Sequence, residues 1–203
     1  MNIVSLILAA GEAKRFGSLK QLAVINGQSM LNTAITQHRL AGIDKIVVVL
    51  GAKANRIQQQ IDPLVDVVLA PNWQLGMGES IRVGVDFIKH RRYPKTSNIL
   101  IGLGDQVAVK SAQILKLCNA VKSNSTSIVA ADYGDNIGVP ACFPAHTFND
   151  LLNLNSTNAN LQKGAKTILS AYRQNVVTVN MPEAQLDIDT TEDLRRWCNF
   201  SSQ

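Results

Sequence analysis

Two cations and two glycines lie close together near the start of the chain. Gly11 and Gly17 bracket a segment in which alanines keep the side chains small, so a ligand can approach the main chain and accept hydrogen bonds from its N–H groups. Arg15 and Lys20 lie in the same loop. A guanidinium binds two phosphate oxygens at once, and an ammonium acts as a mobile point charge. We therefore expect this loop to bind a polyphosphate.

Three carboxylates later in the chain complement these cations. Asp105 follows a short apolar run, and its side chain is expected either to bind a metal or to form a turn with its own backbone. The preceding glycine leaves room for an ion, which favours the metal. Thr190 and Asp193 form a capping-box pattern that explains Asp193 locally but does not explain Asp187 or Asp189. We predict that Asp105, Asp189 and Asp187 hold Mg²⁺, which prefers carboxylate oxygens.

A second glycine-rich loop runs from Asn72 to Ser80 and opens an apolar-periodic segment. Backbone N–H groups at a helix start form a favourable site for an anion or a base edge. The alternative is a capped helix start in which Ser80 and Glu79 act only locally. We include this loop among the candidate nucleotide-binding segments.

Neither of two common phosphate-binding motifs fits the first loop. A Walker A loop has four residues between its first glycine and Gly-Lys-Ser/Thr, whereas five residues separate Gly11 from Gly17 and Ser18-Leu19 follows. A dinucleotide fingerprint needs Gly-x-Gly-x-x-Gly and an acidic residue after the second strand. The chain has neither at the required spacing, which argues against a dehydrogenase.

Short apolar runs alternate with helix-period segments and place these residues. Buried strands are predicted at 3–9 and 45–50, further strands at 66–69, 98–102, 127–131 and 176–179, and a strand near a binding surface at 138–144. Helices are predicted after Ser29 and over 54–61, 81–88, 111–122, 145–154 and 164–172, with a polar loop at 153–160. The alternation favours a three-layer α/β/α sandwich around a mostly parallel, Rossmann-like sheet. Ligands of such sheets bind at the carboxyl ends of the strands.

Composition excludes several classes of protein. The chain has 203 residues, 46% hydrophobic and 17% charged, which fits one globular domain over 1–203. The net charge of +5 comes from scattered basic residues, and only 5% of the residues are aromatic, so we expect a small anionic ligand and no nucleic acid. Three cysteines without disulfide or zinc spacing indicate a cytoplasmic protein. We expect no membrane association, because no run reaches spanning length and no cation precedes the first apolar run.

The first loop resembles the signature of the nucleotidyltransferases, which reads Leu-Ala-(Ala/Gly)-Gly and then Arg-(Met/Phe)-Gly-x-x-Lys. Further matches in the same order resemble the molybdenum cofactor cytidylyltransferases and the related molybdopterin-guanine dinucleotide branch. This resemblance implies the nucleotide-diphospho-sugar transferase type of fold, with a nucleotide-binding half at about 1–133 and an acceptor-side half at about 134–203. The matching segments are Leu8-Ala-Ala-Gly11, Arg15-Phe-Gly17 with Lys20, 72–80, Gly104-Asp-Gln106, Gly138-Val-Pro140, Gly164-Ala-Lys166 and Asp187-Ile-Asp-Thr190.

The resemblance implies roles for individual residues. Arg15, Lys20 and Asp105 are expected to be catalytic, with Arg15 and Lys20 on the phosphates. The alanine at position 10 resembles the cytidylyl branch, although sugar and isoprenoid-precursor transferases share it. The expected nucleotide-binding residues are Leu8, Ala9, Ala10, Gly11, Arg15, Lys20, Asn72, Gly76, Gly78, Ser80 and Asp105.

Three positions depart from the family pattern. Val107 and Thr191 stand where prolines are common, and Lys166 stands for a frequent arginine. None of these changes removes a carboxylate, so the metal prediction is unaffected, but the identity of the acceptor is less well defined.

The sequence therefore predicts a nucleotidyltransferase that uses Mg²⁺. The expected reaction transfers CMP from CTP, favoured over GTP, to the terminal phosphate of molybdopterin with release of pyrophosphate. A molybdoenzyme that receives the product is a possible partner. Two alternatives stay open, namely the same chemistry on a sugar phosphate or another small phosphorylated acceptor, and a non-catalytic carrier of the molybdenum cofactor.

Overall fold

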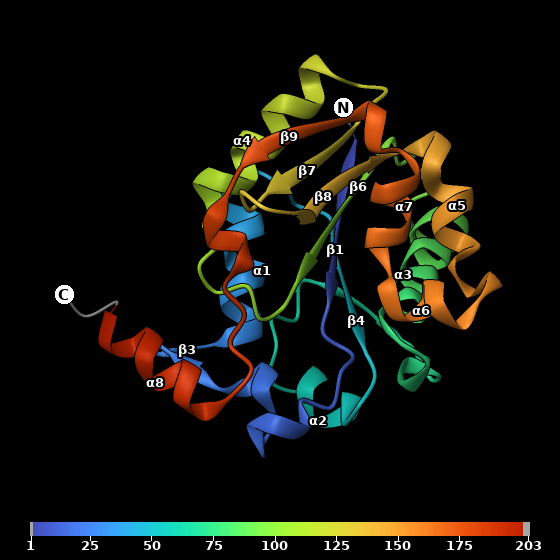
Figure 1. Cartoon of the computed structure of the whole chain (residues 1–203). Helices are drawn as coiled ribbons and strands as arrows, with labels where there is room; N and C mark the ends of the chain where they lie inside the picture. Colours follow the sequence, from blue (N-terminus) through green and yellow to red (C-terminus); the bar gives the residue numbers. More distant parts are fainter. Residues whose placement is uncertain (1, 201–203) are drawn as a thin grey trace.

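A mostly parallel sheet runs through the centre of the molecule (Figure 1). The computed structural model describes residues 2–200. The sheet has seven strands in the order β5-β4-β1-β6-β8-β7-β9, and only β8 in this sheet runs antiparallel to its neighbours. The strands are β1 (Ile3–Leu8), β4 (Ile46–Leu50), β5 (Asp66–Leu69), β6 (Asn98–Leu103), β7 (Ile128–Asp132), β8 (Ile137–Pro144) and β9 (Val176–Asn180).

Helices cover both faces of this sheet, which confirms the predicted three-layer sandwich (Figure 1). One face carries α1 (Met30–Leu40), α2 (Ala54–Gln58) and α4 (Ser111–Ser123), and the other carries α3 (Met77–Asp86), α5 (Phe148–Leu152), α6 (Asn158–Lys163) and α7 (Ala165–Ala171). Helix α8 (Thr191–Phe200) lies away from the central sheet, where Leu194 and Trp197 pack on a cluster that contains Phe16 and Ile25. Strands β1 and β4 are almost wholly buried because helices cover both of their faces.

Short turns connect these elements. Strands β2 (Val24–Ile25) and β3 (Gln28–Ser29) form a hairpin whose turn residues Asn26 and Gly27 have φ of 49° and 82°. Ser29 then caps α1, because its hydroxyl accepts a hydrogen bond from the Asn32 N–H. The other helical turns are η1 (Lys14–Phe16), η2 (Lys20–Leu22), η3 (Trp73–Leu75), the π-helical η4 (Phe87–Arg92), η5 (Ala145–Thr147), η6 (Leu154–Ser156), η7 (Arg173–Asn175) and η8 (Pro182–Gln185).

Three segments differ from the expectations drawn from the sequence. Part of the polar tract 153–160 is helical, since α6 begins at Asn158 behind the hydroxyl of Thr157, which accepts a hydrogen bond from the Asn160 N–H. The loop at 72–80 is largely helical, with η3 followed by α3 from Met77. The acids at 187 and 189 follow a helical turn and not a strand. Within residues 2–200, no helix is long and apolar enough to cross a membrane.

Candidate active site

Three strands end side by side at one edge of the sheet. Leu8 of β1 is in register with Val49 of β4 and with Leu103 of β6. Backbone hydrogen bonds continue beyond the strands, from the Ala52 N–H to the Ala10 carbonyl at 2.9 Å and from the Gly104 N–H to the Leu8 carbonyl at 3.0 Å. The loop after β1 and the loop carrying Asp105 are therefore neighbours although about ninety-five residues separate them in the sequence.

The loop after β1 is held by the side chain of Gln21. Its buried carboxamide donates to the Ala9 carbonyl at 3.1 Å and to the Gly11 carbonyl at 2.8 Å. A Cβ built on Gly11 would meet no protein atom within 4 Å, so the missing side chain leaves open space at the loop surface. Gly17, with φ of 74°, takes the left-handed conformation that ends η1.

Lys20 is the centre of an ionic cluster. Its Nζ donates to Asp105 Oδ2 at 2.7 Å and to Asp189 Oδ1 at 2.8 Å, and only 8% of its side chain is accessible to solvent. The exposed Arg15 guanidinium donates through Nη2 to Asp189 Oδ2 at 2.7 Å. The fold thus joins a cation of the first loop, the acid after β6 and an acid near the C-terminal end of the chain.

The protonation of this cluster follows from its neighbours. Burial acts to lower the pKa of Lys20, but Asp105 and Asp189 outweigh it and raise the pKa above its ordinary value. The hydrogen bond from Lys20 is the main cause that lowers the pKa of Asp189. Burial of the carboxyl, with repulsion from Asp105, raises the pKa of Asp187 to about 6, although part of that residue is exposed. Lys20 and Asp189 are charged at neutral pH.

One oxygen of the cluster has no partner. Asp105 Oδ1 is buried and accepts no hydrogen bond, which is the condition expected of an oxygen that binds a cation. Within residues 2–200, no three acids, histidines or cysteines converge on a common metal position, so Asp105, Asp187 and Asp189 do not form a three-ligand cage. A hard cation that is held partly by substrate phosphates needs only one or two carboxylates, and Asp105 with Asp189 fits that requirement.

A cavity of about 360 Å³ opens beside the cluster, between the first loop and the start of α3. It is large enough for a small-molecule ligand. Lys20 and Asp105 both line it, so the two share one cavity. The predicted residues on its walls are Leu8, Ala9, Ala10, Gly11, Lys20, Gly76, Ser80 and Asp105.

Three of the predicted nucleotide-binding residues, Asn72, Gly78 and Arg15, lie outside this cavity. Asn72 lines a separate depression beside Arg82. Gly78 is buried where α3 meets α6, and a Cβ there would approach the Leu161 Cα to 2.8 Å, so this glycine permits helix packing. The cavity is also not lined by Asp187 or Asp189. Asp189 is connected to the cavity wall by its hydrogen bond from Lys20, which does line the cavity.

The cavity also contains residues that the sequence did not single out. Trp73 and Gln74 from η3, and Met77 from α3, face the loop after β1. Trp73 packs so closely on Gly51 that a Cβ there would lie 2.6 Å from the indole Cγ. In the sequence, the glycines at positions 76 and 78 were the signal that marked the segment containing Trp73, Gln74 and Met77. Four further lining residues carry no sequence pattern that marks them, namely Ala13, Gln21, Met30 and Leu103, whereas Gly104 belongs to the Gly104-Asp-Gln106 segment.

Gln106, next to Asp105, holds a second set of loops. Its buried carboxamide donates to the Val139 carbonyl at 2.9 Å and to the Ala184 carbonyl at 2.7 Å. Ala184 belongs to η8, which leads to Asp187 and Asp189. The two buried glutamines, Gln21 and Gln106, therefore fix the loops on both sides of the ionic cluster.

Comparison with known proteins places these features in context. The family described as the MobA-like NTP transferase domain matches residues 5–176. The crystal structure of Rv0371c from Mycobacterium tuberculosis H37Rv superimposes with a TM-score of 0.80 at 27% identity and covers 98% of each chain. Another structure of Rv0371c, in complex with manganese, has a TM-score of 0.77 at 27% identity and covers 98% of this chain and 99% of that one.

Two curated relatives match part of the chain. The bifunctional protein GlmU of Clostridium beijerinckii is 31% identical over 139 residues, which are 66% of this chain and 30% of GlmU. The nicotine blue oxidoreductase of Paenarthrobacter nicotinovorans is 29% identical over 118 residues, or 58% of this chain and 55% of that protein. The matched region thus spans 30% of the length of the first of these relatives.

Proposed function

Because the chain belongs to the family of MobA-like NTP transferase domains, we propose that this nucleotidyltransferase transfers CMP from CTP to the terminal phosphate of molybdopterin. The observation that carries the proposal is the Lys20–Asp105–Asp189 cluster on the wall of a ligand-sized cavity. A buried ammonium with two carboxylates supplies the charges that two phosphorylated substrates require.

The reaction needs no nucleophile from the protein. An oxygen of the acceptor phosphate attacks the α-phosphorus of the nucleotide, a new O–P bond forms, and the bond to the β-phosphate breaks to release pyrophosphate. The protein has to hold the two substrates in line and stabilise the charge that develops. In our proposal Lys20 and Arg15 donate hydrogen bonds to the phosphates of the nucleotide and to the departing pyrophosphate.

The acids of the site fit a divalent cation. Asp105, whose buried Oδ1 has no partner, would hold Mg²⁺ together with Asp189 or Asp187. When bound, the ion supplies positive charge to the phosphates. The manganese complex of Rv0371c supports a divalent ion but not a particular one.

Ala10 supports a pyrimidine nucleotide. It lines the cavity, and an alanine at this position resembles the cytidylyl branch. The three cysteines, which lack disulfide and zinc spacing, support a cytoplasmic location, where thiols remain reduced.

A second candidate is the same reaction on a sugar phosphate, because the alanine at position 10 also resembles the sugar nucleotidyltransferases. It differs from the first only in the acceptor. A non-catalytic carrier of the cofactor is the alternative from another class. It does not account for a cluster of opposite charges beside a cavity of nucleotide size.

Pyrophosphate release tests the proposal directly. The protein is incubated with CTP, GTP, ATP or UTP, with Mg²⁺, and with molybdopterin or glucose 1-phosphate. We expect release with CTP and molybdopterin. Release only with the sugar phosphate would select the second candidate, and binding of molybdopterin without any release would select the carrier.

A further inference from the structure

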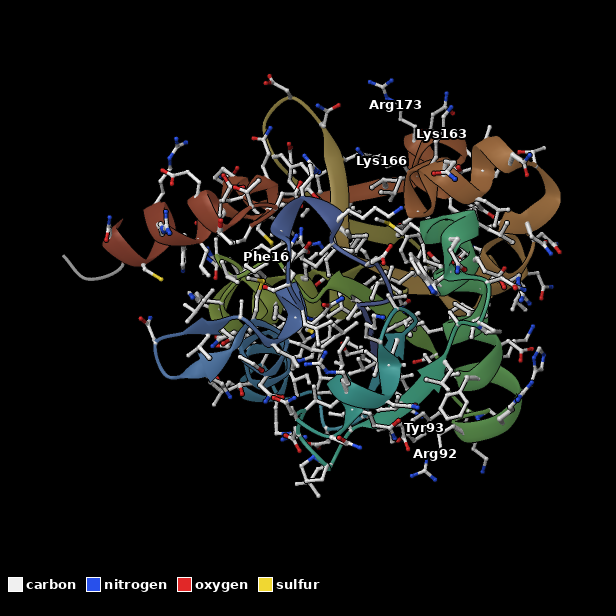
Figure 2. The ribbon with its side chains drawn as sticks, turned by 90° about the horizontal axis from the view of Figure 1, so that it is seen from below. Phe16, Arg92, Tyr93, Lys163, Lys166 and Arg173 are labelled. Carbon is white, nitrogen blue, oxygen red and sulfur yellow. The ribbon has the colours of Figure 1, made fainter. Side chains whose placement is uncertain are left out.

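Helix α8 places an apolar face against the loops around the ionic cluster. Leu194 and Trp197 are three residues apart, so they lie on one face of the helix. Both pack against a second, apolar cluster of buried side chains. Figure 2 shows Phe16, a member of this apolar cluster, beside the first loop and on the side from which α8 approaches. The buried members of the apolar cluster come from segments far apart in the chain, namely Phe16, Ile25, Met30, Val107 and Ile188.

Phe16 connects the apolar cluster to the first loop. It follows Arg15 directly within η1 and is 5% exposed. Because η1 is only three residues long, it has little stability of its own, and the burial of Phe16 holds it in place. The side chain of Arg15 is exposed, so its position is set by the backbone of η1 and by its ion pair with Asp189. The packing of α8 therefore bears on the place from which Arg15 reaches a phosphate.

Val107 connects the same apolar cluster to the loop of Asp105. Its side chain is 2% exposed, and its N–H donates to the Asp105 carbonyl at 3.0 Å. Lys110 adds a polar link, because its Nζ donates to the Val107 carbonyl at 2.8 Å and lies 5.5 Å from the centroid of the Trp197 ring. Trp197 is thus attached to the loop of Asp105 through the apolar cluster and through Lys110.

The first turn of α8 holds the acid near the C-terminal end of the chain. Asp193 Oδ2 accepts the Asp189 N–H at 3.2 Å and the Thr190 N–H at 2.8 Å, so the helix cap fixes the backbone of Asp189. Ile188, the residue before Asp189, is buried in the apolar cluster. One helix is therefore attached to all three segments that contribute to the ionic cluster.

We propose that Leu194 and Trp197 are positioning residues of the active site. Their packing keeps Arg15 and Asp105 in the arrangement that binds the nucleotide and the divalent cation. This inference rests on the proposed function and deepens it, because it assigns to α8 the assembly of the nucleotide site. When α8 leaves the apolar cluster, the first loop and the loop of Asp105 lose their apolar cover. Only the fraction of molecules with α8 packed then binds CTP, so the apparent affinity falls by that fraction.

Hydrogen exchange at two amides tests the packing role without any substrate. The Phe16 N–H donates to the Ala13 carbonyl at 2.9 Å and reports on the first loop. The Val109 N–H donates to the Gln106 carbonyl at 3.1 Å and reports on the loop that follows Asp105. Both amides are protected for as long as their loop stays closed, so their exchange rates measure local opening.

The variant Trp197→Ala is compared with a conservative and an exposed variant. We expect both reporter amides to exchange roughly fivefold faster or more in Trp197→Ala, because local opening then exposes less apolar surface. Trp197→Phe should restore most of the protection, and Arg195→Ala should leave it unchanged, because the Arg195 side chain is 77% accessible. The Ser5 N–H, which donates to the Lys45 carbonyl, is the internal standard for the intact sheet. Leu194→Ala gives the same test if Trp197→Ala does not fold. Wild-type exchange at both reporter amides would overturn the inference.

Steady-state kinetics test the connection to the active site. In the pyrophosphate-release assay we expect Trp197→Ala to raise the KM for CTP about tenfold with a smaller change in kcat. Trp197→Phe and Arg195→Ala should stay close to the wild type. A merely structural role of α8 would lower the melting temperature and leave KM unchanged, so faster loop exchange at an unchanged KM would contradict the positioning role. If the loops exchange faster while no nucleotide and acceptor yield pyrophosphate, the proposed function fails and the attachment of the loops to α8 stands.

Discussion

At the scale of single residues, Asp189 holds Arg15 and Lys20 of the first loop. Its two oxygens accept hydrogen bonds from Arg15 and Lys20 at 2.7 and 2.8 Å. The phosphates of a nucleotide would compete with Asp189 for these donors, and negative charge brought by the substrate would repel the acid. We therefore propose that nucleotide binding is coupled to the segment that leads into α8.

Removal of the central charges should abolish turnover. In Lys20→Ala or Asp105→Ala we expect pyrophosphate release to fall by roughly 100-fold or more, the usual effect of losing one electrostatic contact in a transition state. Lys14→Ala is the control, because that side chain lies in the same loop and is 84% accessible. Melting temperatures show whether each variant is folded. Near-normal turnover in both site variants would remove the assigned roles.

Gln21 should act as a positioning residue. Gln21→Met keeps the length of the side chain but loses both hydrogen bonds to the Ala9 and Gly11 carbonyls. We expect a KM for CTP about tenfold higher with a smaller change in kcat, and a loss of roughly 1–3 kcal/mol in the free energy of unfolding, since the buried Ala9 carbonyl and the partly buried Gly11 carbonyl lose a donor. The exposed Gln28→Met serves as the control. A fall in kcat at unchanged KM would contradict the positioning role.

At the scale of elements, the site forms where strands end and helices begin. The parallel strands β1 and β6 bring Ala9 and Asp105 to one edge, and η8 with the capping box of α8 brings Asp189. In that box the Thr190 N–H donates to Asp193 Oδ2 at 2.8 Å, and the Asp193 N–H donates to Thr190 Oγ1 at 3.1 Å. The glycines of the site differ in role, because Gly11 borders open space while Gly78 lies between two helices.

A pair of glycine variants separates binding from packing. In Gly11→Ala we expect little change in the free energy of unfolding but weaker CTP binding, because the added methyl group occupies space beside the cavity. In Gly78→Ala we expect a loss of about 1–3 kcal/mol, because the methyl group meets the Leu161 backbone. Urea unfolding and calorimetry with CTP measure the two effects. The prediction fails if Gly11→Ala is the less stable variant of the two.

At the scale of the whole molecule, the sheet is fixed to its helical layers by apolar packing and by one buried polar contact. Ser5 of β1 and His38 of α1 form a hydrogen bond of 2.7 Å between Oγ and Nδ1, inside the core. Burial lowers the pKa of His38 from 6.5 to about 4. The imidazole is therefore neutral in the folded protein at pH values where the unfolded chain takes up a proton.

This histidine should make stability depend on pH. Above about pH 6.5 His38 is neutral in both states, whereas between pH 6.5 and 4 only the unfolded chain is protonated, so stability decreases as the pH falls through that window. The loss attributable to His38 is of the order of 3 kcal/mol. Urea unfolding between pH 7 and 4.5 measures it. His38→Gln should show a shallower decrease than the wild type, and the exposed His146→Gln should keep the full one. Equal slopes in all three proteins would exclude His38 as the cause.

The sequence by itself determined the local features of this protein. Continuous apolar runs predicted the buried strands β1, β4 and β6, and Ser29 predicted the cap of α1. The signature loop predicted the family, and the residues after two parallel strands were expected at a common edge. These features depend on neighbours in the chain, so their patterns are visible in one sequence.

Only the tertiary structure decided which residues meet. It showed that Asp189 pairs with both Arg15 and Lys20, that Asn72 and Gly78 lie outside the cavity, and that two glutamines hold the surrounding loops. These contacts join carboxamides and charges to backbone groups far away in the chain, and no periodicity marks such partners. The helix α6 within a polar tract is a similar case, because its packing against α3 outweighs its composition.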